Sequence, residues 1–210
     1  MMNLSLAQLL IGGDGGASAL AIGGAVVLVT ATLLALRPRA TAHSFAWIFV
    51  AAAAYSVLAL GAAWRGPGGD GLQAALVQLV SVLLAGALGA AVRSRPQDAP
   101  GSPSSSLALV GRALAWLSLV GLPPTVGFHG KILVYRALLA ARWEELTVLA
   151  MAGSAISLLP ALWAIRSPGR AVVRGPRALL TVALIVSILI LGLHPEAVLS
   201  LTRQLAAVLP

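Results

Sequence analysis

Long uncharged apolar runs alternate along the chain with short segments rich in Arg, Gly and Pro. A helix needs roughly 20 mainly apolar residues to cross about 30 Å of hydrocarbon. Seven runs approach that length, at about 18 to 36, 45 to 64, 71 to 92, 107 to 122, 124 to 142, 146 to 165 and 178 to 193. Main-chain groups must be paired in lipid, and these runs do not alternate in polarity, so we expect helices and not barrel strands. The pattern predicts an all-α, polytopic transmembrane helical bundle with about seven spans, forming a single membrane domain over residues 1–210.

The composition supports a membrane protein over a soluble enzyme. Hydrophobic residues make up 59% and charged residues 10% of the chain, and the mean hydropathy is +0.96, far from the averages of soluble domains. The net charge of +8 comes mostly from arginines in the short connections, without interleaved aromatic residues, so we expect no nucleic-acid partner. With no cysteine, neither a thiolate metal site nor an iron–sulfur cluster is expected in this chain.

Two polar connections bear on the topology. The segment Ser94 to Ser106 is rich in Pro, Ser and Gly and is expected outside the bilayer. The segment Arg166 to Arg177 contains four arginines, which favours the cytoplasm. With three spans between them, the two connections would lie on opposite sides of the membrane. The basic residues would then number five on one side and six on the other, which does not decide the orientation. The tail after Pro195 fits either an amphipathic surface helix or an ordinary terminus.

Few ionisable residues fall inside the predicted spans, and an ionisable group at membrane depth is a functional candidate by default. Arg112 and Arg136 lie within about two turns of a predicted helix end, so their side chains are expected to reach the interface. Lys131 is the only lysine in the chain. A lysine removed from water can gain and lose a proton near neutral pH, whereas arginine stays protonated. We therefore predict that Lys131 is a proton carrier, with His129 as its candidate neighbour in the relay.

The segment before Lys131 is unfavourable for a regular helix. It contains three glycines and two prolines, namely Gly121, Pro123, Pro124, Gly127 and Gly130. Interrupted helices expose main-chain groups that are tolerated only against protein or a water-filled cavity, and in transporters such breaks mark ion sites. We predict one helix broken near Pro123 to Gly130, with these five residues as its hinge. A plain loop between two spans is the alternative.

Several motifs together resemble those of a known family. The runs LSLVGLPPTVGFHGKILVYRALLAA (Leu117 to Ala141) and AMAGSAISLLPALWAIR (Ala150 to Arg166) are similar to subunit N of respiratory complex I, NADH-quinone oxidoreductase. LLALRPRATAHSFAW (Leu33 to Trp47) and LGLHPEAVLSLTRQ (Leu191 to Gln204) extend the likeness, and Tyr55 falls where the family has Gly-Tyr. The resemblance covers only the C-terminal half of that family's fourteen-helix fold. It implies half of an antiporter-like inverted-repeat fold.

The resemblance also implies a function. The chain would be a membrane-arm subunit of a proton-translocating NADH-quinone oxidoreductase in the cell inner (plasma) membrane, coupling proton translocation to quinone reduction. It would hold no cofactor itself. NADH, FMN, iron–sulfur clusters and quinone would belong to partner subunits, and its own partners would be other membrane-arm subunits and the lipid bilayer.

The departures from the family leave alternatives open. Ala42 and His43 stand where the family has a Lys-Arg pair, which makes His43 a secondary relay candidate, and His129 replaces an apolar residue. The related subunits L and M and the cation/proton antiporters carry His and Lys on the helix at 71 to 92, where this chain has Gln73 and Gln78, so subunit N is favoured. The absence of carboxylates from the spans favours a non-pumping structural subunit. The shared fold also permits a component of a cation/proton antiporter or of a membrane-bound hydrogenase.

Overall fold

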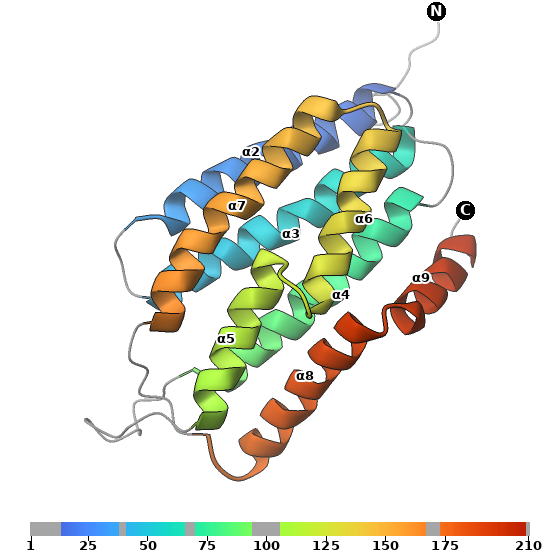
Figure 1. Ribbon diagram of the computed structural model, residues 1–210. Helices are drawn as coiled ribbons and strands as arrows, with labels where there is room; N and C mark the ends of the chain where they lie inside the picture. The colour runs from blue at the N-terminus through green and yellow to red at the C-terminus, as the bar shows by residue number, and fades with distance from the viewer. Residues whose placement is uncertain (1–13, 38–40, 66–69, 94–105, 167–172, 209–210) are drawn as a thin grey trace, which may run out of the picture.

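In the computed structural model, residues 14–37, 41–65, 70–93, 106–166 and 173–208 are described, and these residues form helices and no strands. The helices are α2 (Asp14–Ala35), α3 (Thr41–Arg65), α4 (Asp70–Ala91), α5 (Ser106–Val120), α6 (Val126–Ala140), α7 (Glu144–Arg166), α8 (Pro176–Leu193) and α9 (Glu196–Val208). Figure 1 shows them as one elongated bundle. The predicted all-helical fold is confirmed.

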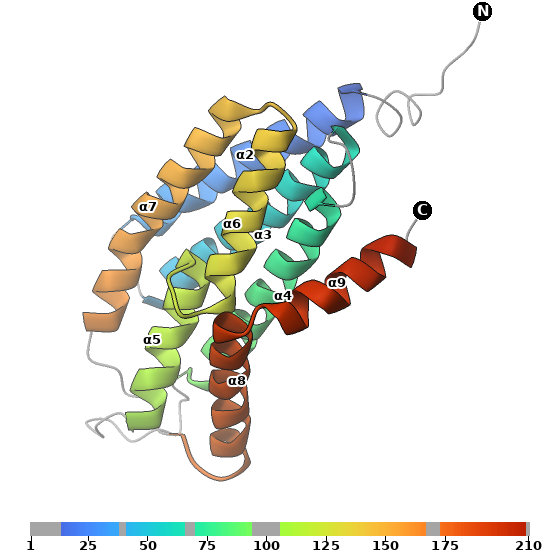
Figure 2. The same cartoon turned by 45° about the vertical axis from the view of Figure 1, so that its right-hand side comes forward.

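The described helices differ in their ability to cross a membrane. Five of them, α2, α3, α4, α7 and α8, are long and apolar enough to do so. Helices α5 and α6 have 15 residues each, which is about 22 Å at 1.5 Å per residue and short of the hydrocarbon core. Both views show α5 and α6 following one another in the same direction (Figures 1 and 2). The runs 107 to 122 and 124 to 142 therefore form one discontinuous crossing, and the described residues make six crossings where seven were predicted.

This count changes the topology. Helices α4 and α7 end, and α5 and α8 begin, at the same end of the bundle (Figure 1). At that end Arg177 Nη2 donates hydrogen bonds to the main-chain oxygens of Ala91, at 2.7 Å, and Arg93, at 3.0 Å. The prediction that the connections at 94 to 106 and 166 to 177 leave opposite faces is therefore wrong, because two crossings separate them and not three. Residues 94–105 and 167–172 themselves lie outside the described residues.

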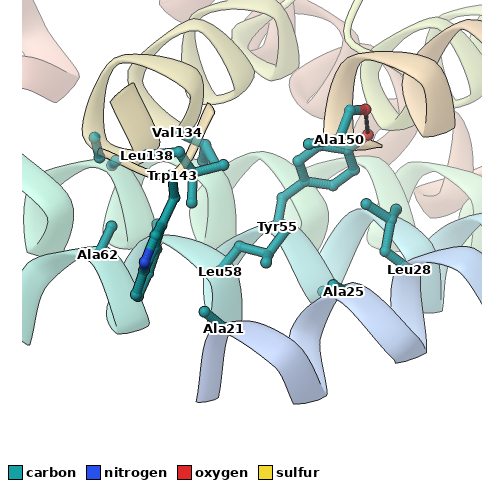
Figure 3. Packing of buried hydrophobic residues seen from close by; sticks show 14 of the residues in the cluster. Ala21, Ala25, Leu28, Tyr55, Leu58, Ala62, Val134, Leu138, Trp143 and Ala150 are labelled. Atoms are coloured by element: carbon teal, nitrogen blue, oxygen red, sulfur yellow. Dashed lines mark hydrogen bonds between the residues drawn. The ribbon is translucent and has the colours of Figure 1, made fainter. Parts of the chain in front are cut away.

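Small residues let the helices approach closely. Where α2 meets α3, a Cβ on Gly61 would lie 3.0 Å from the main-chain oxygen of Ala17. Lipid provides little hydrophobic drive between helices, so close backbone approach and dispersion must hold them together. Larger buried side chains, among them Tyr55, Leu58 and Trp143, fill the space between α3 and α6 (Figure 3). This packing places the middle of α3 directly beside α6.

The C-terminal tail forms a helix docked on the bundle. Helix α9 turns away from the end of α8 (Figure 2) and packs on the first turns of α4, where Gln73 Nε2 donates to the main-chain oxygen of Leu199 at 3.1 Å. Val198 and Thr202 are buried in this contact. The interpretation of residues 196–208 as an ordinary frayed terminus is therefore wrong.

Candidate functional site

Lys131 is buried against the break between α5 and α6. Its side chain is 3% exposed, and Nζ donates to the main-chain oxygen of Val120 and to Ser154 Oγ, each at 2.6 Å. Val120 is the last residue of α5. The last carbonyls of a helix have no partner inside it, and together they carry a partial negative charge. The end of α5 is thus a ready acceptor for the ammonium group.

Two further helices complete this site. Ser154, on α7, also donates to the main-chain oxygen of Val120 at 3.1 Å. The Tyr55 ring, on α3, faces the ammonium, with Nζ 4.5 Å from the ring centroid, a cation–π geometry. The Tyr55 hydroxyl donates to the main-chain oxygen of Ala150 on α7 at 2.6 Å (Figure 3). Helices α3, α5, α6 and α7 therefore converge on one nitrogen atom.

The charge at this site is balanced by dipoles in the described part of the chain. Each described acidic residue stands in the first turn of a helix: Asp14, Asp70, Glu144, Glu145 and Glu196. A carbonyl, a hydroxyl and an aromatic face are weaker partners for an ammonium than a carboxylate. The geometry suits a nitrogen that alternates between two protonation states.

Gly121 shapes the site in two ways. Its φ is +82°, a conformation that glycine adopts without penalty, and the main-chain nitrogens of Gly121 and Leu122 both donate to the oxygen of Leu117 at 2.9 Å to close α5. A Cβ on Gly121 would lie 2.6 Å from Lys131 Cδ. Only glycine both ends α5 here and leaves room for the lysine stem.

The predicted hinge residues divide into two groups. Gly121, Pro123 and Pro124 lie in the break itself, at 121–125, where proline cannot supply a helical N–H. Gly127 and Gly130 lie inside α6. A Cβ on Gly127 would collide with the main-chain oxygen of Ser118, and one on Gly130 would lie 2.5 Å from Gln78 Oε1. These two glycines bring α6 close to α5 and α4, and the break is shorter than predicted.

His129 faces away from Lys131. Positions two apart on a helix lie about 200° apart around its axis, and His129 Nε2 lies 2.7 Å from the main-chain oxygen of Gly192 at the end of α8. A Cβ on Gly192 would collide with the main-chain oxygen of Pro124. His129 therefore links the first turn of α6 to the end of α8, on the far side of α6 from the lysine.

His43 lies far from this site. It is near the start of α3, where it accepts a hydrogen bond from Trp47 Nε1 at 2.8 Å. Twelve positions separate it from Tyr55 on the same helix, which corresponds to about 18 Å along the axis. The structure does not bring His43 to Lys131. Of the two spanning arginines, Arg136 is exposed and Arg112 half-buried.

Sequence reasoning missed two of the groups around Lys131. Ser154 was not singled out, although it is a small polar residue in the middle of an apolar helix, and Val120 contributes only its main chain. Gln78 is a third buried polar residue near this site that the sequence did not mark as a site residue. Its side chain is fully buried, Nε2 donates to the main-chain oxygen of Ala52 at 3.1 Å, and Oε1 has no partner among the described residues.

The same fold occurs in solved membrane complexes. It matches a chain of the Mrp complex from Dietzia sp. DQ12-45-1b, with TM-score 0.76, 20% identity and coverage of 92% of this chain and 47% of that one. A chain of respiratory complex I from Thermus thermophilus matches with TM-score 0.64, 28% identity and coverage of 87% and 45%. A chain of an archaeal membrane-bound sulfane sulfur reductase matches with TM-score 0.70, 16% identity and coverage of 91% and 42%. The chain is a multi-pass membrane protein with the fold of the antiporter-like subunits.

Sequence relatives narrow this class. The subunit N of NADH-quinone oxidoreductase from Salinispora tropica is 32% identical over 173 residues, 71% of this chain, and that from Cereibacter sphaeroides is 39% identical over 111 residues, 50% of this chain. The chain is a homologue of NADH-quinone oxidoreductase subunit N, which confirms the resemblance seen in its motifs. The aligned regions span 34% and 24% of those two relatives. No family model matches the chain.

Proposed function

We propose that this chain is a membrane-arm subunit of a complex I-like NADH-quinone oxidoreductase in the cell inner (plasma) membrane, where it takes part in proton translocation coupled to quinone reduction. The observation that carries the proposal is Lys131, buried at a helix break among groups that lack a carboxylate in the described residues. Homology with subunit N supports the kind of assembly.

The groups around Lys131 can serve both protonation states of its nitrogen. As an ammonium, Nζ donates to the oxygen of Val120 and to the hydroxyl of Ser154. A neutral amine keeps a donor for Val120 and gains a lone pair, and the Ser154 hydroxyl can turn to donate to it, since a hydroxyl is both donor and acceptor. Neither state leaves a buried polar atom unpaired, so the proton can leave and return at low cost.

The redox chemistry would belong to partner subunits. The sequence has no cysteine, and the described residues contain no group of three or more His, Cys, Asp or Glu side chains that could hold a metal ion. We assign NADH, FMN, iron–sulfur clusters and quinone to partner subunits on the basis of the homology with subunit N. We expect the chain to co-purify with those subunits.

Six crossings make the distribution of arginines strongly asymmetric. The connections at one end of the bundle, with the helix residues that border them, carry Arg37, Arg39, Arg93, Arg95, Arg166, Arg170, Arg174 and Arg177, eight in all. Those at the other end carry Arg65 and Arg142. By the positive-inside rule we assign the arginine-rich end to the cytoplasm. The count of seven crossings concealed this signal, because it divided these residues and Arg203 five against six.

Replacing the lysine tests the proposal. Lys131→Arg keeps the charge but not the ability to release a proton, and Lys131→Ala removes both. Both variants should assemble yet translocate protons at about a tenth of the wild-type rate or less, since a positioned proton carrier contributes roughly 10²-fold or more. Arg136→Lys, on the exposed face of α6, is the matched control and should pump protons at nearly the wild-type rate. Proton pumping in vesicles and recovery of the complex are the two measurements.

The same assay separates the rival functions. Full pumping by Lys131→Arg would reduce Lys131 to a structural charge and favour a non-pumping scaffold subunit. The fold shared with the Mrp complex keeps a cation/proton antiporter or hydrogenase component as a second candidate. Proton movement that requires Na⁺ or K⁺ but neither NADH nor quinone would favour that candidate.

A further inference from the structure

Three arginines lie near the contact between the end of α4 and the start of α8, at the arginine-rich end of the bundle. Arg177, near the start of α8, donates through Nη2 to the main-chain oxygens of Ala91 and Arg93 at the end of α4. These bonds use two of the five N–H donors of a guanidinium and satisfy the terminal carbonyls of α4. Arg93, whose main-chain oxygen accepts one of these bonds, and Arg174, three residues before Arg177, have exposed side chains. Several cationic groups thus share one small region, held in place by the capping bonds.

The local balance of charge calls for an anion. In the described residues, Asp14, Asp70, Glu144 and Glu145 all stand at the opposite end (Figure 1). Among the described residues, the arginine-rich end carries Arg37, Arg93, Arg166, Arg174 and Arg177 and no acidic residue. Like charges held close together favour the uptake of a counter-anion, and a phosphate group matches the fork of a guanidinium.

The surface next to these arginines is apolar and exposed. Leu180, three positions after Arg177 and so near it around the axis of α8, is 52% exposed, and Leu179, which lies farther round the helix, is 76% exposed. On the neighbouring helix α5, Leu109 and Val110 are also exposed. Helices α5, α4 and α8 are in close contact here, since a Cβ on Gly111 would lie 2.7 Å from Val92 Cγ1 and 3.3 Å from Thr181 Cγ2. The region is therefore cationic at its rim and apolar below it, which matches an amphipathic ligand better than a free ion.

We propose that this junction, formed by Arg93, Arg174 and Arg177, binds the phosphate headgroup of an anionic phospholipid from the surrounding leaflet. The acyl chains lie on the exposed leucines of α8 and the neighbouring residues of α5. Basic groups between membrane helices on the cytoplasmic side are suited to such headgroups. The site lies where the start of α8 meets the end of α4, away from the break between α5 and α6 that holds Lys131, and it does not depend on proton transfer there.

Lipid retention tests this inference on the full chain. Protein purified in detergent is given phosphatidylglycerol and phosphatidylcholine in equal amounts, and the lipid that stays bound is measured by native mass spectrometry. Wild type should retain phosphatidylglycerol preferentially. Arg93→Gln and Arg174→Gln should each weaken its binding about fivefold, as expected for a basic residue at a membrane surface. Arg136→Gln, on the exposed face of α6, is the control and should retain the lipid as wild type does.

The variants are chosen so that loss of folding does not imitate loss of lipid. Arg93 and Arg174 have exposed side chains, and Arg177 is left intact because it caps α4. Circular dichroism should show unchanged helicity in both variants. Equal retention of the two lipids by wild type, an effect of Arg136→Gln as large as that of Arg93→Gln, or full displacement of phosphatidylglycerol by inorganic phosphate would each overturn the proposal.

Discussion

The Nζ atom of Lys131 and the main-chain oxygen of Val120 lie 2.6 Å apart across the break between α5 and α6. A continuous helix would hold the Val120 carbonyl in an internal hydrogen bond, and it would not be available to a side chain. Ending α5 at this residue frees the carbonyl at the depth where the only lysine of the chain arrives from α6. The break is therefore what creates the cation site.

Ser154→Ala should impair the site without removing the lysine. The change deletes the second acceptor of Nζ, and leaving a buried charged group short of a partner costs about 1.5 to 3 kcal/mol. We expect slower proton translocation and a lower thermal midpoint of the assembled complex. Ser187→Ala is the control, because Ser187 Oγ bonds only to its own helix at Ala183 in the described structure. Equal effects of the two changes would contradict a specific role for Ser154.

Two substitutions at Tyr55 separate its ring from its hydroxyl. Tyr55→Phe keeps the aromatic face toward Nζ and loses the hydrogen bond to Ala150, a loss of about 1 kcal/mol. Tyr55→Leu also removes the cation–π contact, which adds about 0.5 to 2 kcal/mol. The rate of proton translocation should therefore decrease from wild type to Tyr55→Phe and further to Tyr55→Leu. If Phe and Leu prove equally damaging, the ring face does not support the ammonium.

Gly121→Ala should affect both folding and the site. A side chain at φ +82° is strained by about 1 to 2 kcal/mol, and its Cβ would displace the Lys131 stem. Gly175→Ala isolates the first effect, because Gly175 has φ +58° and no heavy atom within 4 Å of its ideal Cβ. We expect both variants to lose stability in thermal unfolding and only Gly121→Ala to slow proton translocation. Normal proton translocation by Gly121→Ala would mean that the Lys131 side chain can adopt another conformation that still supports translocation.

The membrane topology can be tested by single cysteines, since the chain has none of its own. Ser102→Cys and Ser167→Cys lie in the two connections at the arginine-rich end, and Gly68→Cys lies in a connection at the other end. A membrane-impermeant maleimide should label the first two from the same side, the cytoplasmic one, and the third from the opposite side. Labelling of Ser102→Cys and Ser167→Cys from different sides would restore the seven-crossing topology.

The sequence predicted the helices well because the signals that specify them are local. An uncharged run of about 20 residues must form a helix in lipid, whatever surrounds it. The break was likewise readable, since Gly121, Pro123 and Pro124 disfavour a helix wherever they occur together. The number of membrane crossings could not be predicted from local sequence in this way. Whether α6 continues in the direction of α5 or turns back depends on contacts such as that of Gly127 with the main chain of Ser118.

The sequence by itself determined that Lys131 is an isolated ionisable group in an apolar span beside a helix break. Only the tertiary structure decided its partners, which are Val120, Ser154 and Tyr55 and not His129. The helical period fixes which face of α6 each residue occupies, and it already places positions 129 and 131 on different faces. Which helix lies opposite each face is set by close packing between segments far apart in the chain, and no local pattern carries that information.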